Sequence, residues 1–158
     1  MKKLNNHIKN IAHKTANLPL YWFIPLILLL SYILVLPFAF FDDGVVNPIS
    51  EKSISYRIVV GCLLGPVLET LLHQALPIYL FTKKWIKNRK LAIFISALFF
   101  GLMHSYSLHY ILWTFVGGLL LAWAYLIYYE KYGFEKAFWA ITIVHALRNA
   151  ITLVMEVF

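Results

Sequence analysis

The chain has 158 residues, of which 61% are hydrophobic and only 13% are charged. A soluble domain is about half apolar and about a quarter charged, so this composition excludes an ordinary soluble fold and predicts an integral membrane protein. The net charge of +7 is divided among short basic blocks beside apolar runs, which is typical of topology signals rather than of nucleic-acid binding. Cys62 is the single cysteine, which excludes an intramolecular disulfide and a cysteine-based metal cluster.

The first apolar segment covers residues 19–41 and contains no charged residue. Because a membrane helix needs about 20 mostly apolar residues, this segment predicts a peripheral transmembrane helix, preceded by a basic cytoplasmic tail over residues 1–18. The segment is too long for the apolar region of a signal peptide, so we expect the mature chain to retain it. Pro25 and Pro37 are expected to kink it.

Residues 55–157 are expected to form a four-helix membrane core, after a polar loop at Asp42 and Asp43. The expected helices cover residues 55–81, 91–105, 108–129 and 137–157. The uncharged run Leu91–Tyr129 is far longer than the ~20 residues of one crossing, so we place a turn at the polar residues 104–107. The predicted fold class is therefore all-α, a polytopic bundle of about five spans.

Lysine and arginine predict the orientation of this bundle. The N-terminal tail and the loops at 82–90 and 130–136 carry most of the basic residues, and a five-span chain places all three on one side. Cytoplasmic loops are enriched in Lys and Arg, so the N-terminus is predicted to be cytoplasmic and the C-terminus external. We expect a multi-pass protein of the cell (plasma) membrane, surrounded by the lipid bilayer and without a nucleic-acid partner.

Ionisable residues inside a bilayer are costly, and each is a functional hypothesis by default. The candidates are Glu69, His73, His104, His145 and Arg148, with Gln74 and Asn149 as polar neighbours. Glu69, His104 and His145 belong to three different predicted helices, at depths of roughly 14–21 Å from their cytoplasmic ends for a rise of ~1.5 Å per residue. This common depth predicts one site near the middle of the membrane.

The spacings within the helices favour the same site. Three pairs lie four residues apart and so share a helix face: Glu69 and His73, Phe100 and His104, and His145 and Asn149. A glutamate can act as general base toward water, a histidine can bind a metal or stabilise an oxyanion, and an asparagine can donate to the oxyanion. Hydrolysis of a peptide bond requires these roles together.

Structural explanations stand beside this interpretation. Glu69 could form a buried ion pair with Arg148, His104 could cap a helix end beside the turn, and Asn149 could be an interhelical hydrogen-bond donor. His73 is expected to pack rather than react. The Gly117–Gly118 pair is expected to allow close helix contact. Aromatic residues such as Tyr106, Tyr110 and Trp113 suit interfacial belts or helix packing.

Three motifs occur in order on the predicted core helices: GPVLETLLHQA at residues 65–75, FGLMH at 100–104 and HALRN at 145–149. They resemble the motifs of the CPBP family of intramembrane proteases, also called the Abi family, which comprises CAAX proteases and bacteriocin-processing enzymes. The family pattern is a Pro followed after two residues by a Glu pair, then Phe-x-x-x-His, then His-x-x-x-Asn or Asp. The resemblance covers about residues 55–157.

The resemblance implies that Glu69 activates water and that His104 orients this water or binds a metal. It assigns His145 and Asn149 to the metal or to the developing oxyanion. The chain departs from the family at three positions, where Thr70 replaces the second glutamate, His73 the usual aromatic residue and Gln74 the usual arginine. These three residues and Arg148 are candidate auxiliary residues of the site.

The resemblance implies an intramembrane endopeptidase that hydrolyses a membrane-associated peptide or protein. It leaves open whether a divalent metal such as zinc is held by Glu69, His104 and His145, as in a metalloprotease, or whether no metal is used. Family substrates include prenylated CAAX proteins, pheromone precursors and bacteriocin leaders. The small, bacterial-looking chain favours peptide processing over prenyl-protein maturation.

Two further functions remain open. Thr70 and Gln74 favour a catalytically degenerate family member that acts as a membrane binding or bacteriocin-immunity factor. A membrane haem protein with His104 and His145 as axial ligands would leave Glu69 and Asn149 without a role. A transporter is disfavoured, because five spans in 158 residues leave little room for paired repeats.

Overall fold

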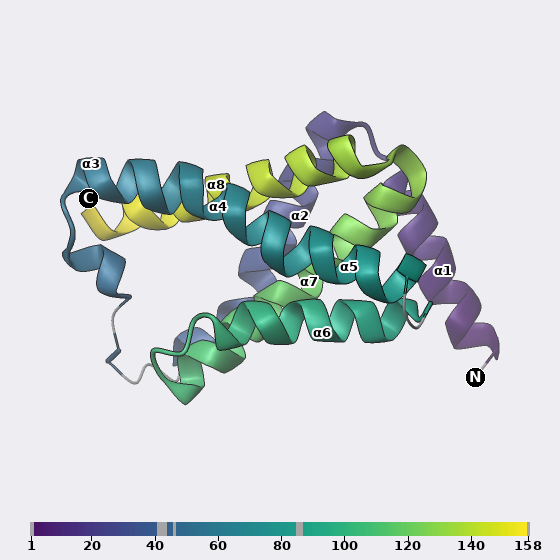
Figure 1. Ribbon diagram of the computed structural model, residues 1–158, viewed down its shortest axis with the longest axis horizontal. Helices are drawn as coiled ribbons and strands as arrows, with labels where there is room; N and C mark the ends of the chain where they lie inside the picture. The colour runs from purple at the N-terminus through teal and green to yellow at the C-terminus, as the bar shows by residue number, and fades with distance from the viewer. Residues whose placement is uncertain (1, 41–43, 46, 85–86, 158) are drawn as a thin grey trace.

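The computed structural model describes residues 2–40, 44–45, 47–84 and 87–157, and within these ranges every regular element is a helix (Figure 1). The separate helices are α1 (Lys2–Ala16), α2 (Leu20–Val35), α6 (Arg89–Leu102), α7 (Leu108–Tyr132) and α8 (Phe134–Val157). Between α2 and α6, one continuous helical segment, Ile54–Lys84, contains α3 (Ile54–Tyr56), α4 (Gly65–Glu69) and α5 (Leu76–Tyr79). Short 3₁₀ turns cover Leu36–Phe40 and Pro48–Glu51. The predicted loop at Asp42 and Asp43 lies outside the described residues.

Four helical segments among the described residues are long and apolar enough to cross a membrane: Leu20–Phe38, Ile54–Lys84, Leu108–Tyr132 and Phe134–Val157. The predicted all-α membrane bundle is therefore confirmed. The remaining predicted crossing corresponds to α6, which has 14 residues. At ~1.5 Å per residue α6 is about 21 Å long, shorter than a hydrocarbon core of ~30 Å, so it does not span such a core unaided.

The turn between α6 and α7 falls at the polar residues where the sequence predicted it. The helix α6 ends at Leu102, and α7 begins at Leu108 after the N-cap residue Ser107. The Ser107 hydroxyl accepts a hydrogen bond from the backbone N–H of Tyr110 at 3.0 Å, which satisfies one of the free donors of the new helix. The basic N-terminal segment, predicted as a tail, is also helical, and it packs against α7.

The segment Ile54–Lys84 keeps its helical course past Pro66 and Pro77 by changing its hydrogen-bond register. Each proline lies in the first turn of a short α-helix, α4 or α5, that follows a π-helical stretch. The π-helical stretches cover Arg57–Leu64, Thr70–Ala75 and Leu80–Lys84. A proline has no N–H to donate, and the local change of register lets the helix continue past each proline.

Glycines allow α6 and α7 to approach each other closely. A Cβ atom on Gly118 would lie 3.2 Å from the Cα of Ala97, and one on Gly101 would lie 3.0 Å from the Ile111 carbonyl oxygen. Any larger residue at either position would push the two helices apart. The predicted close contact therefore exists at Gly118, whereas Gly117 faces Arg148 and Val35.

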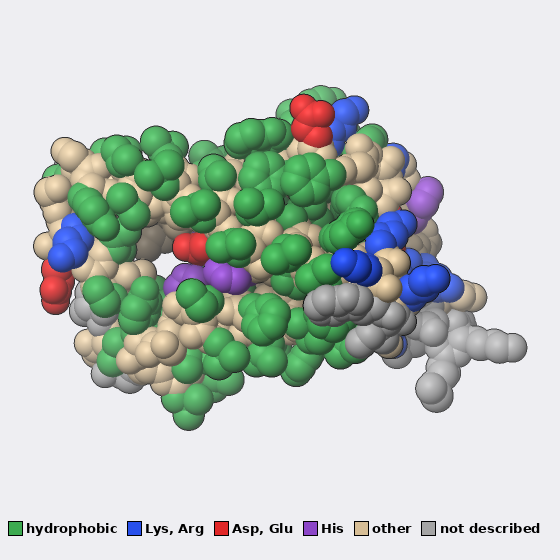
Figure 2. Space-filling view, viewed as in Figure 1, with side chains coloured by type: hydrophobic (Ala, Val, Ile, Leu, Met, Phe, Trp, Pro, Cys, Tyr) green, Lys and Arg blue, Asp and Glu red, His purple; other side chains and the backbone are tan. Residues whose placement is uncertain are grey.

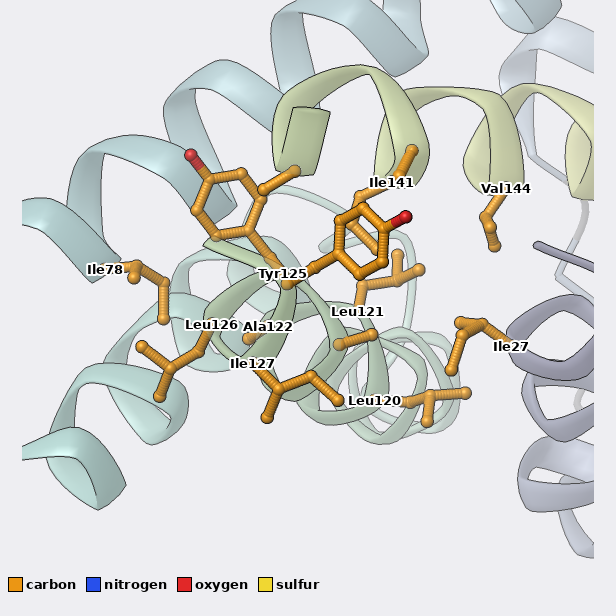
Figure 3. Packing of buried hydrophobic residues seen from close by; sticks show 14 of the residues in the cluster. Ile27, Ile78, Leu120, Leu121, Ala122, Tyr125, Leu126, Ile127, Ile141 and Val144 are labelled. Atoms are coloured by element: carbon orange, nitrogen blue, oxygen red, sulfur yellow. The ribbon is translucent and has the colours of Figure 1, made fainter. Parts of the chain in front are cut away.

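The hydrophobic core lies around the C-terminal half of α7. Leu121, Tyr125 and Leu126 are almost completely buried there against Ile78 of α5 and Ile141 of α8 (Figure 3). This end of the bundle carries α1 and the basic loops, and Figure 2 shows most Lys and Arg side chains of that face gathered there. The opposite end is hollow, and it holds the polar residues of interest.

We expect the end that carries Glu135 to face the cytoplasm and the end that carries Glu51 to face outward, because basic residues remain on the cytoplasmic side. In a Cys62→Ala background, an impermeant maleimide should label Glu51→Cys on intact cells and Glu135→Cys only after permeabilisation. Each substitution removes one exposed carboxylate, so each is the matched control for the other. If intact cells labelled Glu135→Cys and not Glu51→Cys, the orientation would be the opposite of the one expected.

Candidate active site

Glu69, His104 and His145 converge from three helical segments. Glu69 ends α4, His104 follows α6 in the turn, and His145 lies within α8. The Glu69 Oε2 atom is 3.5 Å from His145 Nε2 and 3.8 Å from His104 Nε2. Figure 2 shows acidic and histidine side chains side by side at the edge of a hollow. The structure thus brings together the carboxylate and both imidazoles that the sequence predicted at one depth.

The orientation of His104 is set by its own helix. Its Nδ1 lies 2.8 Å from the carbonyl oxygen of Phe100, and because a carbonyl only accepts, Nδ1 is the donor. In the neutral ring the Nε2 atom then carries a lone pair directed toward Glu69. His104 therefore satisfies a carbonyl at the end of α6, as the capping hypothesis expected, and also presents an acceptor to the site.

His145 is held differently. Its side chain is only 3% exposed, and its Nδ1 atom is buried without a hydrogen-bond partner in the described part of the chain. The Phe100 ring lies edge-on against the imidazole at 5.5 Å between centroids, which fixes the ring plane. Because no partner fixes the tautomer, His145 Nε2 can carry the proton and donate it toward a group beside Glu69.

Asn149 lines the same hollow, but its amide is engaged with the backbone. Asn149 Nδ2 donates to the carbonyl oxygen of Gly61 at 2.8 Å. In the π-helical stretch before α4, the N–H of Gly65 bonds the carbonyl of Val60, five residues back. The next donor in that register would be residue 66, which is a proline, so Asn149 supplies the hydrogen bond that Pro66 cannot make. This contact is the interhelical role that the sequence left open for Asn149.

The buried ion pair between Glu69 and Arg148 that the sequence left open is not present. The Glu69 carboxylate lies between the two histidines instead. The Arg148 guanidinium lies 5.8 Å from the centre of the Tyr32 ring, and the Tyr32 hydroxyl donates to the Arg148 carbonyl at 3.0 Å. Arg148 is thus directed toward α2 and α7 rather than toward Glu69.

The residues that depart from the family pattern lie apart from the hollow. Thr70 and Gln74 are completely buried, and within the described ranges their side-chain polar atoms have no hydrogen-bond partner. His73 is buried with its ring 5.9 Å from that of Phe100, and the Ser96 hydroxyl donates to its carbonyl. None of these three side chains lines the cavity that Glu69 reaches.

The hollow is a cavity of about 670 Å³ that contains Glu69, His104 and His145 in its wall. It extends toward the end of the bundle away from the basic loops, where the ion pair between Arg57 and Glu156 lies. The sequence left interfacial belts or helix packing open for Tyr106, Tyr110 and Trp113, and all three line this cavity. The spacing of Tyr110 and Trp113 after the polar turn, on the face of α7 that also carries Gly117, is the signal that could have identified these two.

The sequence predicted Glu69, His104 and His145 as the ligands of a metal ion. Within the described ranges, no group of three or more His, Cys, Asp or Glu side chains could hold a metal ion. The His104 ring has the backbone partner that a metal ligand commonly has on its second nitrogen, whereas His145 Nδ1 has none. The zinc hypothesis stays a prediction.

The fold and the site define a polytopic membrane protein with a carboxylate and two imidazoles inside its bundle, a set suited to hydrolysis. Residues 51–151 match the family described as Rce1-like, type II CAAX prenyl endopeptidase, and the chain belongs to this family. The family is one of CAAX-type intramembrane proteases, which confirms the resemblance drawn from the three motifs. Comparisons with curated proteins and with solved structures give no match.

Asn149→Ala should destabilise the protein by about 1 kcal/mol, because the Gly61 carbonyl would lose its donor. Pro66→Ala restores a backbone N–H in the right register, so in that background the same substitution should cost about half as much or less. Unfolding of all four proteins in detergent micelles measures this cycle. Equal costs in both backgrounds would contradict the assigned role of Asn149.

Proposed function

We propose that this protein is an intramembrane endopeptidase in which Glu69 activates a water molecule to hydrolyse a peptide bond of a membrane-associated peptide or protein. One observation carries the proposal: the Glu69 carboxylate lies between two imidazoles in the wall of a cavity inside the bundle. Membership of a protease family supports the kind of reaction. The individual residue roles follow from the side-chain geometry.

Glu69 and His104 can hold a water molecule between them. Their facing atoms are 3.8 Å apart, and two hydrogen bonds of ~2.8 Å can bridge up to about 5.6 Å. Both facing atoms are acceptors. The ionised Glu69 carboxylate only accepts, and His104 uses its Nδ1 proton for the hydrogen bond to the Phe100 carbonyl oxygen, which leaves Nε2 with a lone pair. A water there would donate one hydrogen to each of them, which turns its lone pairs toward the cavity.

The same groups can carry the reaction to completion. The water oxygen attacks the scissile carbonyl carbon while Glu69 takes the water proton as general base. His145 Nε2, 3.5 Å from Glu69, is placed to donate to the negative oxygen that develops on the carbonyl. When the C–N bond breaks, Glu69 returns its proton to the leaving amine, and the water oxygen remains in the new carboxyl group.

A catalytically degenerate binding or immunity factor is the competing function. Thr70 and Gln74 favoured it in the sequence, yet both lie outside the cavity wall. The presence of Thr70 and Gln74 where the family pattern has a glutamate and an arginine therefore leaves Glu69, His104 and His145 in place. The two functions differ in a direct observable, the release of a cleaved peptide.

Glu69→Gln should reduce peptide release by about 10²–10⁴-fold, because the amide cannot accept the water proton. The assay incubates membranes containing each variant with the host's membrane-associated peptides and identifies new products by mass spectrometry. Glu130→Gln, which removes a carboxylate at the opposite end of the bundle, is the control and should retain activity. No product from wild type, with the protein stably inserted, would favour the binding function.

His104→Ala and His145→Ala should each lose peptide release while the protein still inserts and accumulates. The first loses an acceptor for the water, and the second loses the donor to the developing oxyanion. His7→Ala, at an exposed position of α1, is the matched control. Full activity in either cavity variant would remove that histidine from the proposed site.

A further inference from the structure

Arg148 is a cation inside a membrane helix that the proposed reaction does not use. It lies in the middle part of α8, where an ionised side chain is costly unless it has a partner or a function. No ion pair within the described ranges includes Arg148, and its Nε atom is buried without a hydrogen-bond partner. The Tyr32 ring offers a cation–π contact, which stabilises the charge but leaves its N–H groups available.

A second unused donor lies in the wall of the same cavity. The Trp113 Nε1 atom is buried and has no hydrogen-bond partner among the residues that the structure describes, although Trp113 and Arg148 both line the cavity. The Arg148 side chain, from α8, approaches the part of α7 that carries Trp113. A Cβ atom on Gly117 would lie 3.8 Å from Arg148 Nη1, and Trp113 lies one helical turn before Gly117.

Tyr110 adds a third polar group to this part of the wall. Its hydroxyl oxygen accepts a hydrogen bond from Asn47 Nδ2 at 3.2 Å, so its own proton is free to be donated. Arg148, Trp113 and Tyr110, which carry a guanidinium, an indole N–H and a phenol, thus line one cavity. Their complement is a group with two acceptor oxygens and a negative charge, which Arg binds in a bidentate manner.

We propose that Arg148 and Trp113 bind a carboxylate of the peptide that occupies the cavity, a role that rests on the proposed endopeptidase function. Arg148 follows His145 by three residues on α8, about 4.5 Å along the helix axis. A peptide covers at most ~3.3–3.6 Å per residue, so a carboxylate held there lies within a few residues of the reacting carbonyl. The pair would select peptides with an acidic group at that distance.

Such a carboxylate has two sources, the free C-terminus of the peptide and an Asp or Glu side chain. Three fluorescent, N-acylated leucine–alanine hexapeptides separate them: a free acid, the same peptide with a C-terminal amide, and the amide with one glutamate. Binding is measured to full-length Glu69→Gln protein in micelles, so no turnover is needed. Failure of the endopeptidase hypothesis is therefore distinguishable from failure of the carboxylate site.

The free acid or the glutamate-containing amide should bind about 10–100-fold more tightly than the plain amide, as expected for a charge-assisted hydrogen bond. Arg148→Gln should abolish this preference, and Arg148→Lys should keep part of it. Trp113→Phe retains an aromatic ring without the N–H and should weaken the preference. If Arg148→Gln does not fold, the relative affinities of the three peptides for the protein with Arg148, and the effect of Trp113→Phe on them, still test the proposed carboxylate site. Equal binding of all three peptides with Arg148 present would overturn the proposal.

Discussion

A carboxylate inside a bilayer must be surrounded by polar groups, and the rest of this structure depends on that constraint. Glu69 meets it through His104 and His145, at 3.8 and 3.5 Å, and through a cavity of about 670 Å³. The close approach of α6 and α7 at their glycines helps to place the end of the short helix α6, which His104 follows, inside the bundle. The chemistry of the site therefore depends on the closeness of two helix backbones.

The same constraint governs the backbone of the segment that carries Glu69. A proline one turn before the carboxylate deprives a carbonyl of its donor, and hydrocarbon offers no water to replace it. The amide of Asn149 fills this role from α8. One side chain thus links the helix of Glu69 to the helix of His145, so the relative position of these two groups is set by a hydrogen bond as well as by packing.

The sequence predicted much of this arrangement. The predicted core helices begin and end within a few residues of those found, because charges and the polar turn at residues 104–107 interrupt the apolar runs sharply. Common depth and helical spacing predicted the meeting of Glu69 with both histidines. The partners of Asn149 and Arg148 could not be predicted, because they depend on helix rotation and on the π-helical register before Pro66. Periodicity of the sequence specifies neither.

The hydrophobic core lies at one end of the bundle and the cavity that contains Glu69 lies at the other, so the two ends differ in what they contribute to the protein. Buried residues of α5, α7 and α8 hold the helices together near the basic loops, whereas the cavity wall contributes little to that core. Exchanging a side chain such as Trp113 in the hollow end would remove few core contacts. Peptide preference can therefore diverge among related chains while the folding of the bundle is conserved, since mutations that alter recognition and mutations that alter stability fall in different regions.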